Sequence, residues 1–291
     1  MTDGFLVVDK APGMTSHDVV AVARKALGTR KVGHAGTLDP TATGVLVLGF
    51  GNGTRLLQYI TDGDKSYTAT VVLGASTITD DREGEVISEV SASHISDEDI
   101  TSGLAKMVGE IQQRPSSVSA VKVAGERAYD RVRAGEVFEL AARTITISSL
   151  NVLEIRRPGS RIEIDIDVTC SAGTFIRAIA RDLGCDLQVG GHLSTLRRTR
   201  VAGFPISQAI SFDELKAQNF APLALSDVAR ATFPVRELAL DEVSELSFGR
   251  PLTSNPSDEI FAALSPDNRL IALLKNEASK AKPIAVFAAA N

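Results

Sequence analysis

A strict alternation of apolar and acidic residues in the middle of the chain most constrains its fold. The segment 161–170 contains Ile162, Glu163, Ile164, Asp165, Ile166, Asp167 and Val168 in direct succession. A period of two places successive side chains on opposite faces of a strand, so one face is expected to cover a core and the other to meet water. This division is typical of antiparallel sheets with one solvated face. A second clear strand is predicted over 144–155.

Other apolar segments predict the elements around this sheet. Further strands are expected at 5–8, 45–49, 65–73 and 85–90. The alternating residues of 65–73 predict a half-exposed strand. Helices are expected at 16–27, capped by Thr15 and closed by Gly28, at 54–60, from Ser96 to about 108, from the segment 171–177 to 184, and after the capping box Ser211–Glu214.

The segment 31–44, KVGHAGTLDPTATG, interrupts this regular pattern and carries one carboxylate, Asp39. Its glycines and Pro40 permit turn conformations that a helix or a central strand would exclude. Because Pro40 disfavours the α region for the residue before it, the Asp39 side chain leaves the loop in a defined direction. Taken alone, Asp39-Pro40 is better explained by a tight turn in which Asp39 accepts hydrogen bonds from nearby amides.

Length and charge limit the kind of partner that the chain can bind. At 291 residues it exceeds the usual size of one domain, so we expect a large domain and a small one. The net charge of -5 argues against a protein that coats RNA, because phosphate contacts dominate such binding. A focused site remains open, since binding depends on the local potential. Basic residues cluster at 24–25, 30–31, 127–133, 156–157 and 197–200.

The ends of the chain and its cysteines predict a cytoplasmic protein. The first ten residues, MTDGFLVVDK, lack the features of a signal peptide, and no apolar run reaches the ~18 residues that span a bilayer. Cys170 and Cys185 are isolated from each other and from any histidine cluster. Reduced thiols, no metal site and no cofactor are therefore expected.

The segment 33–55, GHAGTLDPTATGVLVLGFGNGTR, resembles the main signature of the TruB family of tRNA pseudouridine synthases. Further segments resemble other motifs of this family, over residues 5 to 200 in all: DKAPGMTSHDVV, DGDKSYTA, SAVKVAGERAYDRVRAG, SAGTFIRAIARDLG and GGHLSTLRRTRVAGF. The chain departs from the motifs at Ala11, where proline is usual, and at Phe175, where tyrosine is common. The segment DKAPGMTSHDVV is expected to buttress the loop that carries Asp39.

The resemblance implies three catalytic residues. Asp39 would be the nucleophile, Arg177 its ion-pair partner, and Tyr67 the residue that stacks on the target base, with its hydroxyl a candidate proton acceptor. Without the resemblance, a surface pair with Asp182 explains Arg177 better, and a strand residue with a buried ring and an exposed hydroxyl explains Tyr67 better.

The resemblance also implies four residues that contact the substrate. Phe175 and Leu196 would form the apolar part of the pocket, and His34 would fill the space that the base vacates. Lys122 would lie near the active site, within a thumb-like insert around 112–142 that closes over the RNA loop. A histidine in a loop is otherwise more often structural, as we expect for His192.

The implied fold class is α+β. It is a pseudouridine-synthase fold with a large mixed, mostly antiparallel sheet flanked by helices and loops, plus a small β-rich C-terminal domain. We expect the catalytic domain to span 1–230 and a PUA-like domain to span 231–291.

The implied activity is the isomerisation of uridine 55 in the T loop of tRNA to pseudouridine, by base flipping and an aspartate nucleophile. The T-stem-loop would be the partner of a monomer that needs no other protein. Two alternatives remain open: the catalytic subunit of a guide-RNA pseudouridylation particle, and a tRNA-binding folding helper. Activity on a bare T-arm hairpin separates the first from the implied enzyme, and an Asp39→Asn variant separates the second.

Overall fold

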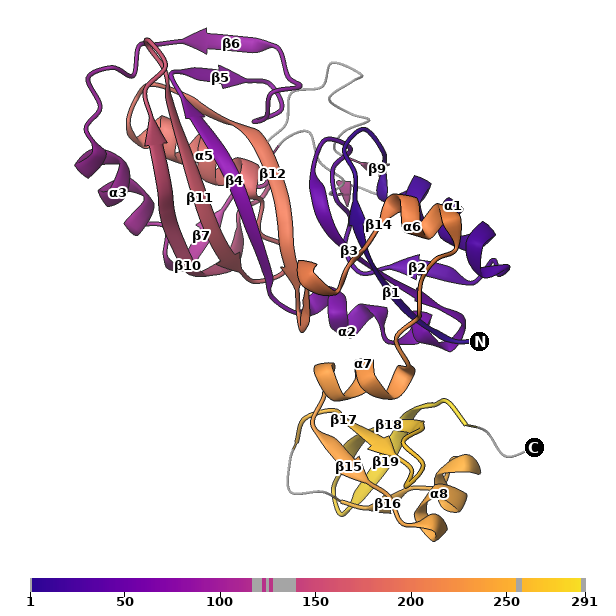
Figure 1. Cartoon of the computed structure of the whole chain (residues 1–291). Helices are drawn as coiled ribbons and strands as arrows, with labels where there is room; N and C mark the ends of the chain where they lie inside the picture. Colours follow the sequence, from indigo (N-terminus) through magenta and orange to yellow (C-terminus); the bar gives the residue numbers. More distant parts are fainter. Residues whose placement is uncertain (1, 117–121, 124–125, 128–139, 255–257, 289–291) are drawn as a thin grey trace.

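The computed structural model describes residues 2–116, 122–123, 126–127, 140–254 and 258–288 (Figure 1). Within them, one large sheet is mixed and mostly antiparallel, as predicted. Its strands are, in order across the sheet, β14 (Ile210–Ser211), β1 (Gly4–Lys10), β3 (Thr43–Phe50), β12 (Gly191–Val201), β4 (Lys65–Leu73), β11 (Ile162–Cys170), β10 (Arg143–Arg156) and β7 (Gly109–Gln113). At its sides, β2 (Val32–His34) pairs with β3, and β13 (Phe204–Pro205) pairs with β12.

The large sheet consists of two halves that meet at a narrow junction. Strands β3 and β12 run parallel and pair only at Arg197 with Thr43 and at Arg198 with Gly44. Beyond these pairs the two strands diverge, and Figure 1 shows the halves spreading apart above the junction. Gly44 has a φ of +101°, and a Cβ added there would lie 2.1 Å from the Arg198 carbonyl oxygen. The close approach of the two halves therefore requires glycine at position 44.

Helices pack against both halves of the sheet. Helix α1 (Ser16–Leu27) packs against α6 (Phe212–Ala217) over β1 and β3, and α5 (Ile176–Asp186) packs against β12 and β4, with α3 (Asp97–Ala105) beside it. Helix α1 has the predicted ends, a capping box at Thr15 and a left-handed Gly28. The capping box at Ser211 is confirmed too. Helix α3 ends three residues before the predicted position.

Strands β11 and β4 test the alternation argument in two settings. In β11 the four branched residues are fully buried and the acidic residues between them are partly exposed, which confirms the prediction. The prediction of a half-exposed β4 is wrong. Only Thr68 and Thr70 are partly exposed. Polar contacts cover the start of β4, where the Lys65 ammonium bonds the Thr61 and Gly63 carbonyls. The predicted helix at 54–60 is divided into a 3-10 turn, η1 (Gly51–Arg55), and α2 (Leu57–Asp62).

Two short ribbons and one further turn complete this part of the chain. Strands β5 (Ala75–Thr77) and β6 (Val86–Glu89) form one ribbon, which includes the strand predicted at 85–90. The other ribbon is β8 (Lys122–Val123) with β9 (Glu126–Arg127), and η2 (Ile206–Gln208) follows β13. Most of the predicted insert 112–142 lies outside the described residues.

A separate small sheet forms the C-terminal unit, which is β-rich as predicted. It contains β15 (Val235–Glu237), β17 (Phe261–Leu264), β18 (Leu270–Glu277), β19 (Lys280–Val286) and β16 (Leu252–Thr253), in this order, with α8 (Leu240–Ser247) against it. Helix α7 (Leu225–Thr232) lies between the two units in Figure 1. We propose that the domain boundary falls near residue 230, within this helix. No helix among the described residues has the length and apolar character to cross a bilayer.

Candidate active site

The loop that carries Asp39 is fastened to the segment after β1. The Lys10 ammonium donates to the Pro40 carbonyl oxygen at 3.1 Å, and the Gly13 N–H donates to the same oxygen at 2.9 Å. The Ser16 hydroxyl accepts from the Leu38 N–H at 2.9 Å. These bonds hold the residues on both sides of Asp39, which confirms the predicted buttress.

Lys10 is a fully buried cation whose partners are carbonyl oxygens. Besides Pro40, its ammonium donates to Ala11 at 3.0 Å and to Met14 at 2.8 Å. Burial lowers the pKa of Lys10 from 10.5 to about 8, and the nearby Asp39 carboxylate opposes this change.

Arg198 fastens the other end of the same loop from β12. Its Nη2 donates to the Gly36 carbonyl at 3.0 Å and its Nε to the Val45 carbonyl at 2.8 Å, and the guanidinium lies near the Tyr67 hydroxyl. Only 2% of the residue is exposed. The sequence indicated only that Arg198 belongs to the basic cluster at 197–200, and not that its side chain reaches from β12 across to the loop.

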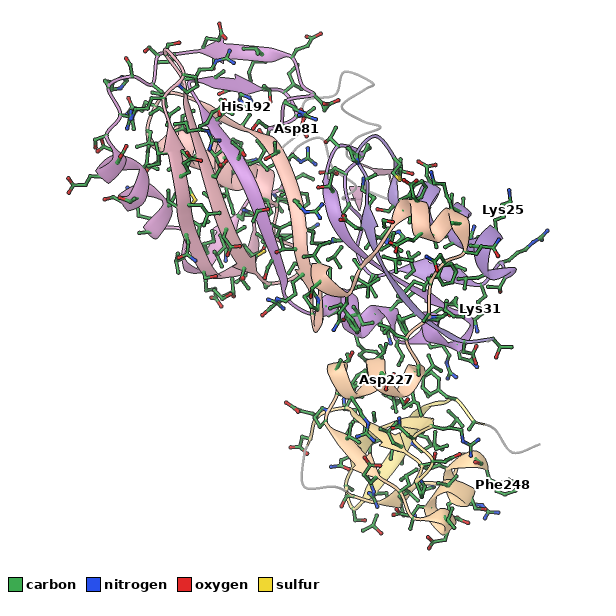
Figure 2. The ribbon with its side chains drawn as sticks, viewed as in Figure 1. Lys25, Lys31, Asp81, His192, Asp227 and Phe248 are labelled. Atoms are coloured by element: carbon green, nitrogen blue, oxygen red, sulfur yellow. The ribbon has the colours of Figure 1, made fainter. Side chains whose placement is uncertain are left out.

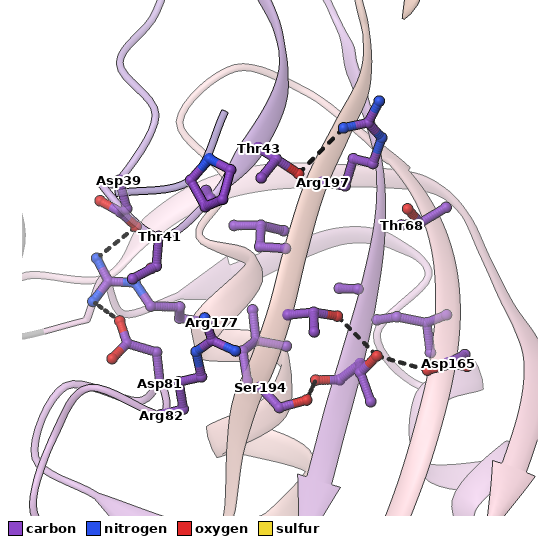
Figure 3. Close-up of a pocket in the computed structure, with 18 of the residues that line it drawn as sticks. Asp39, Thr41, Thr43, Thr68, Asp81, Arg82, Asp165, Arg177, Ser194 and Arg197 are labelled. Carbon is purple, nitrogen blue, oxygen red and sulfur yellow. Dashed lines mark hydrogen bonds and ion pairs between the residues drawn. The ribbon is translucent and has the colours of Figure 1, made fainter. Parts of the chain in front are cut away.

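Asp39 and Arg177 form an ion pair at 3.3 Å (Figure 3). The second nitrogen of Arg177 lies 3.3 Å from Asp81 and donates to the Thr79 carbonyl at 2.8 Å. The Arg177 side chain is 9% exposed, whereas that of Asp39 is 44% exposed. The surface pair with Asp182 is excluded, since Asp182 contacts Arg181 instead. The guanidinium is thus fixed while the carboxylate stays accessible.

Two cavities adjoin this ion pair. One, of about 620 Å³, is lined by Asp39 and Arg177 together with Tyr67, Phe175 and Leu196, so that it gathers five of the seven predicted site residues. The other, of about 510 Å³, shares Asp39, Arg177 and Leu196 with the first. Figure 3 shows Asp39, Arg177 and Asp81 at one side of this second cavity. Among the other residues that line it, six carry hydroxyl groups. These hydroxyls belong to Thr41, Thr43, Thr68, Thr70, Ser194 and Thr195.

Tyr67 and Phe175 are held by polar contacts behind the larger cavity. Burial raises the pKa of Tyr67, and the Arg198 guanidinium at its hydroxyl opposes the rise. The Gln113 side chain accepts from the Phe175 N–H at 2.8 Å and donates to the Phe175 carbonyl at 3.1 Å. Because Phe175 immediately precedes α5, these two bonds also fix the start of the helix that carries Arg177.

His34 lies outside this group, and the position of the Lys122 side chain is not described. His34 does not line either cavity, and its ring meets the edge of His17 with 5.6 Å between ring centroids. The pKa of His34 is lowered, mainly because its ring is buried. The backbone of Lys122 lies in β8, and its side chain is outside the described residues. His192 is structural as expected, with Nδ1 3.0 Å from the Ala75 carbonyl.

Several predicted basic clusters are neutralised within the chain. Arg156 contacts Asp165 at 2.5 Å and Glu154 at 2.7 Å, Arg157 pairs with Asp97, and Arg197 pairs with Asp9 at 2.7 Å. Two members of the N-terminal clusters, Lys25 and Lys31, project outward from the other half of the sheet (Figure 2). Sequence analysis also missed the contacts of Asp81 and Gln113, which lie in segments without a recognisable motif.

Family models account for most of the chain. Residues 24–176 match the N-terminal domain of the TruB family pseudouridylate synthases. The chain belongs to the TruB family. Residues 177–231 match the tRNA pseudouridylate synthase B C-terminal domain, and 233–288 match the C-terminal model of tRNA pseudouridine synthase II. This TruB family member is therefore a pseudouridine synthase, an enzyme of the isomerase class.

Individual relatives agree with this assignment. The tRNA pseudouridine synthase B of Arthrobacter sp. (strain FB24) is 51% identical, over 100% of this chain and 98% of its own length. That of Mycobacterium ulcerans (strain Agy99) is 48% identical, over 98% and 94%. A solved Cbf5-Nop10-Gar1 complex contains a chain that is 26% identical, with a TM-score of 0.72 over 98% of this chain and 84% of that one. The TruB family member thus has the pseudouridine-synthase fold, as predicted.

Proposed function

We propose that this TruB family member isomerises uridine 55 in the T loop of tRNA to pseudouridine, with Asp39 as the nucleophile. The observation that carries the proposal is the Asp39–Arg177 ion pair beside a cavity walled by Tyr67, Phe175 and Leu196. The names of the relatives from Arthrobacter and Mycobacterium support tRNA as the substrate class.

The reaction requires a pocket that holds a base throughout. The N-glycosidic bond of the uridine breaks, the uracil turns, and a C–C bond forms to the same ribose. A uracil stacked inside a folded RNA must first be flipped out, which costs a few kcal/mol. A loop nucleotide is easier to extrude than a helical one, so a T-loop uridine suits this enzyme.

Asp39 has the two properties that a nucleophile needs here. Its carboxylate is accessible from the cavity, and Arg177 gives it a fixed counter-charge in one orientation. The contacts of Arg177 with Asp81 and the Thr79 carbonyl keep the guanidinium in place when substrate enters. No step of this mechanism requires a group that the chain itself does not supply.

Tyr67 would stack on the flipped uracil and accept a proton through its hydroxyl. The ring lines the cavity. To accept a proton the hydroxyl must first be ionised to phenolate, a form that burial disfavours and the nearby Arg198 guanidinium stabilises. Phe175 and Leu196 would form the apolar walls around the base. His34 would occupy the gap that the base leaves in the RNA, and Lys122 would contact the RNA from the insert.

A bare T-arm hairpin tests the proposal. The uridine at position 55 carries tritium at C5, and the new C–C bond releases that tritium to water. We expect release by the protein alone, as a monomer without protein partner or guide RNA. Release that begins only when a guide RNA is added would favour a subunit of a guided particle, and no release from a folded sample would contradict the enzyme assignment. If the protein were a folding helper, the Asp39→Asn variant would restructure tRNA as well as the wild type does.

A further inference from the structure

Four basic residues line the larger cavity beside Asp39, and three of them are already engaged. These residues are Lys65, Arg143, Arg177 and Arg198. The Lys65 ammonium donates to the carbonyl oxygens of Thr61 and Gly63. Arg177 lies between two carboxylates, and Arg198 donates to the carbonyls of Gly36 and Val45. Of these four, Arg143 alone makes no side-chain hydrogen bond or ion pair with any described residue.

The backbone of Arg143 is held in a strand, although its guanidinium bonds none of the described residues. It is the first residue of β10 and pairs directly with Gln113 on β7. The next residues on the same face of β10, Ile145 and Ile147, are buried in the core under α5. Arg143 therefore leaves the strand just beyond the core, beside the Gln113 side chain that holds Phe175. A rigid strand thus presents an exposed cation at the rim of the cavity.

An RNA substrate requires such a cation at this point. A nucleotide that enters the cavity brings its two flanking phosphates to the rim, where Asp39 and Asp62 contribute negative charge. Repulsion between these carboxylates and the phosphates is reduced by a cation that has no other partner. A guanidinium also matches a phosphate in geometry, because it donates two parallel hydrogen bonds.

We propose that Arg143 binds a backbone phosphate next to the target nucleotide. This inference rests on the proposed function for its RNA substrate. It assigns to Arg143 a specific contact with the substrate, while Arg177 and Arg198 organise the protein side of the site.

The affinity of the T-arm hairpin at several salt concentrations tests this assignment. We expect Arg143→Gln to weaken binding roughly tenfold and to lower the slope of log K against log salt by about one. Arg143→Lys keeps the charge and should keep most of the slope. Arg250→Gln removes the same charge from the C-terminal unit and should change neither quantity. Equal affinity and slope in the wild type and Arg143→Gln would overturn the inference.

Neutral linkages identify the phosphate. Two hairpins each carry one methylphosphonate, on the 5′ or on the 3′ side of the target uridine. For the wild type, we expect one of the two modified hairpins to bind roughly tenfold more weakly than the unmodified hairpin. For Arg143→Gln, the same modified hairpin and the unmodified hairpin should bind equally well. Equal losses in both proteins for both hairpins would contradict a contact between Arg143 and either phosphate.

Tritium release distinguishes this inference from the function on which it rests. If the wild type releases no tritium but its binding depends on Arg143 as described, the phosphate contact stands and the proposed reaction fails. If the wild type releases tritium and Arg143→Gln binds as the wild type does, the reaction stands and the phosphate contact fails.

Discussion

The Arg177 guanidinium lies 3.3 Å from the Asp39 carboxylate, although the two residues come from opposite halves of the divided sheet. Arg177 belongs to α5 on one half, and Asp39 belongs to the loop before β3 on the other. The ion pair therefore spans the point where the halves diverge, and the two cavities adjoin it. The geometry of the site depends on how the halves meet.

Replacing Asp39 by asparagine should abolish turnover and leave RNA binding intact. The amide preserves shape but is no longer an anionic nucleophile, so we expect the single-turnover rate to fall by roughly 10⁴-fold or more. Tritium release measures the rate, and a filter-binding titration of the T-arm hairpin measures affinity. Turnover close to that of the wild type would show that another group attacks.

Replacing Arg177 by lysine should slow the reaction without abolishing it. The two terminal nitrogens of Arg177 reach Asp39 on one side and Asp81 with the Thr79 carbonyl on the other. The single nitrogen of a lysine does not reproduce this fork, so the Asp39 carboxylate loses its fixed orientation. We expect a loss of about 100-fold in the single-turnover rate. Arg181→Lys, one helical turn later, is the matched control and should react at nearly the wild-type rate. Equal losses in the two variants would indicate a general effect on α5.

Removing the Tyr67 hydroxyl separates stacking from proton transfer. Tyr67→Phe keeps the ring, so we expect unchanged affinity for the hairpin and a rate lower by roughly 10²–10⁴-fold. Tyr59→Phe, whose ring contacts Phe233 away from the cavity, serves as the control. A wild-type rate for Tyr67→Phe would restrict Tyr67 to stacking.

Alanine at position 44 should destabilise the protein through the junction of the halves. The new Cβ would overlap the Arg198 carbonyl, and the positive φ adds strain, so we expect a loss of roughly 3 kcal/mol or more in the free energy of unfolding. Gly13 has a φ of +81° with no atom within 4 Å of an added Cβ, so Gly13→Ala should cost only about 1 kcal/mol. Urea unfolding measures both, and equal costs would remove the close approach as the cause.

The buried Lys10 should make stability depend on pH. Its pKa falls from 10.5 to about 8 on folding, so between these values the unfolded chain holds a proton that the folded protein has released. Stability therefore rises with pH across this window, and the cost of burying the charge is fully present below it. Relative to Lys10→Met, we expect the free energy of unfolding of the wild type to increase by up to about 3 kcal/mol across the window. A difference that stays constant or decreases would contradict the shifted pKa.

Local signals in the sequence predicted local structure well. The cap at Thr15, the left-handed Gly28 and the alternation in β11 depend on residues close together in the chain, and each is found as predicted. Strand β12 was missed because it has neighbours on both sides and carries arginines, so that apolar alternation does not mark it. The sequence identified Arg198 on this strand only as part of a basic cluster, and the structure buries it.

The candidate site was predictable only in part. Resemblance pointed to Asp39 and Arg177, and the structure brings them together. The contacts of Asp81, Gln113 and Arg198 join segments that are distant in the chain, and no spacing rule specifies such contacts. The experiments above test the role of each predicted residue.

The internal pairing of the arginines has a kinetic consequence. Arg156, Arg157 and Arg197 each face a carboxylate, and the whole chain carries a net charge of -5. Such a charge distribution exerts little long-range pull on a polyanion, so diffusional encounter with the substrate gains little from electrostatic steering. Binding of the substrate then depends on short-range fit after collision. Different RNAs are therefore expected to differ more in their dissociation rates than in their association rates.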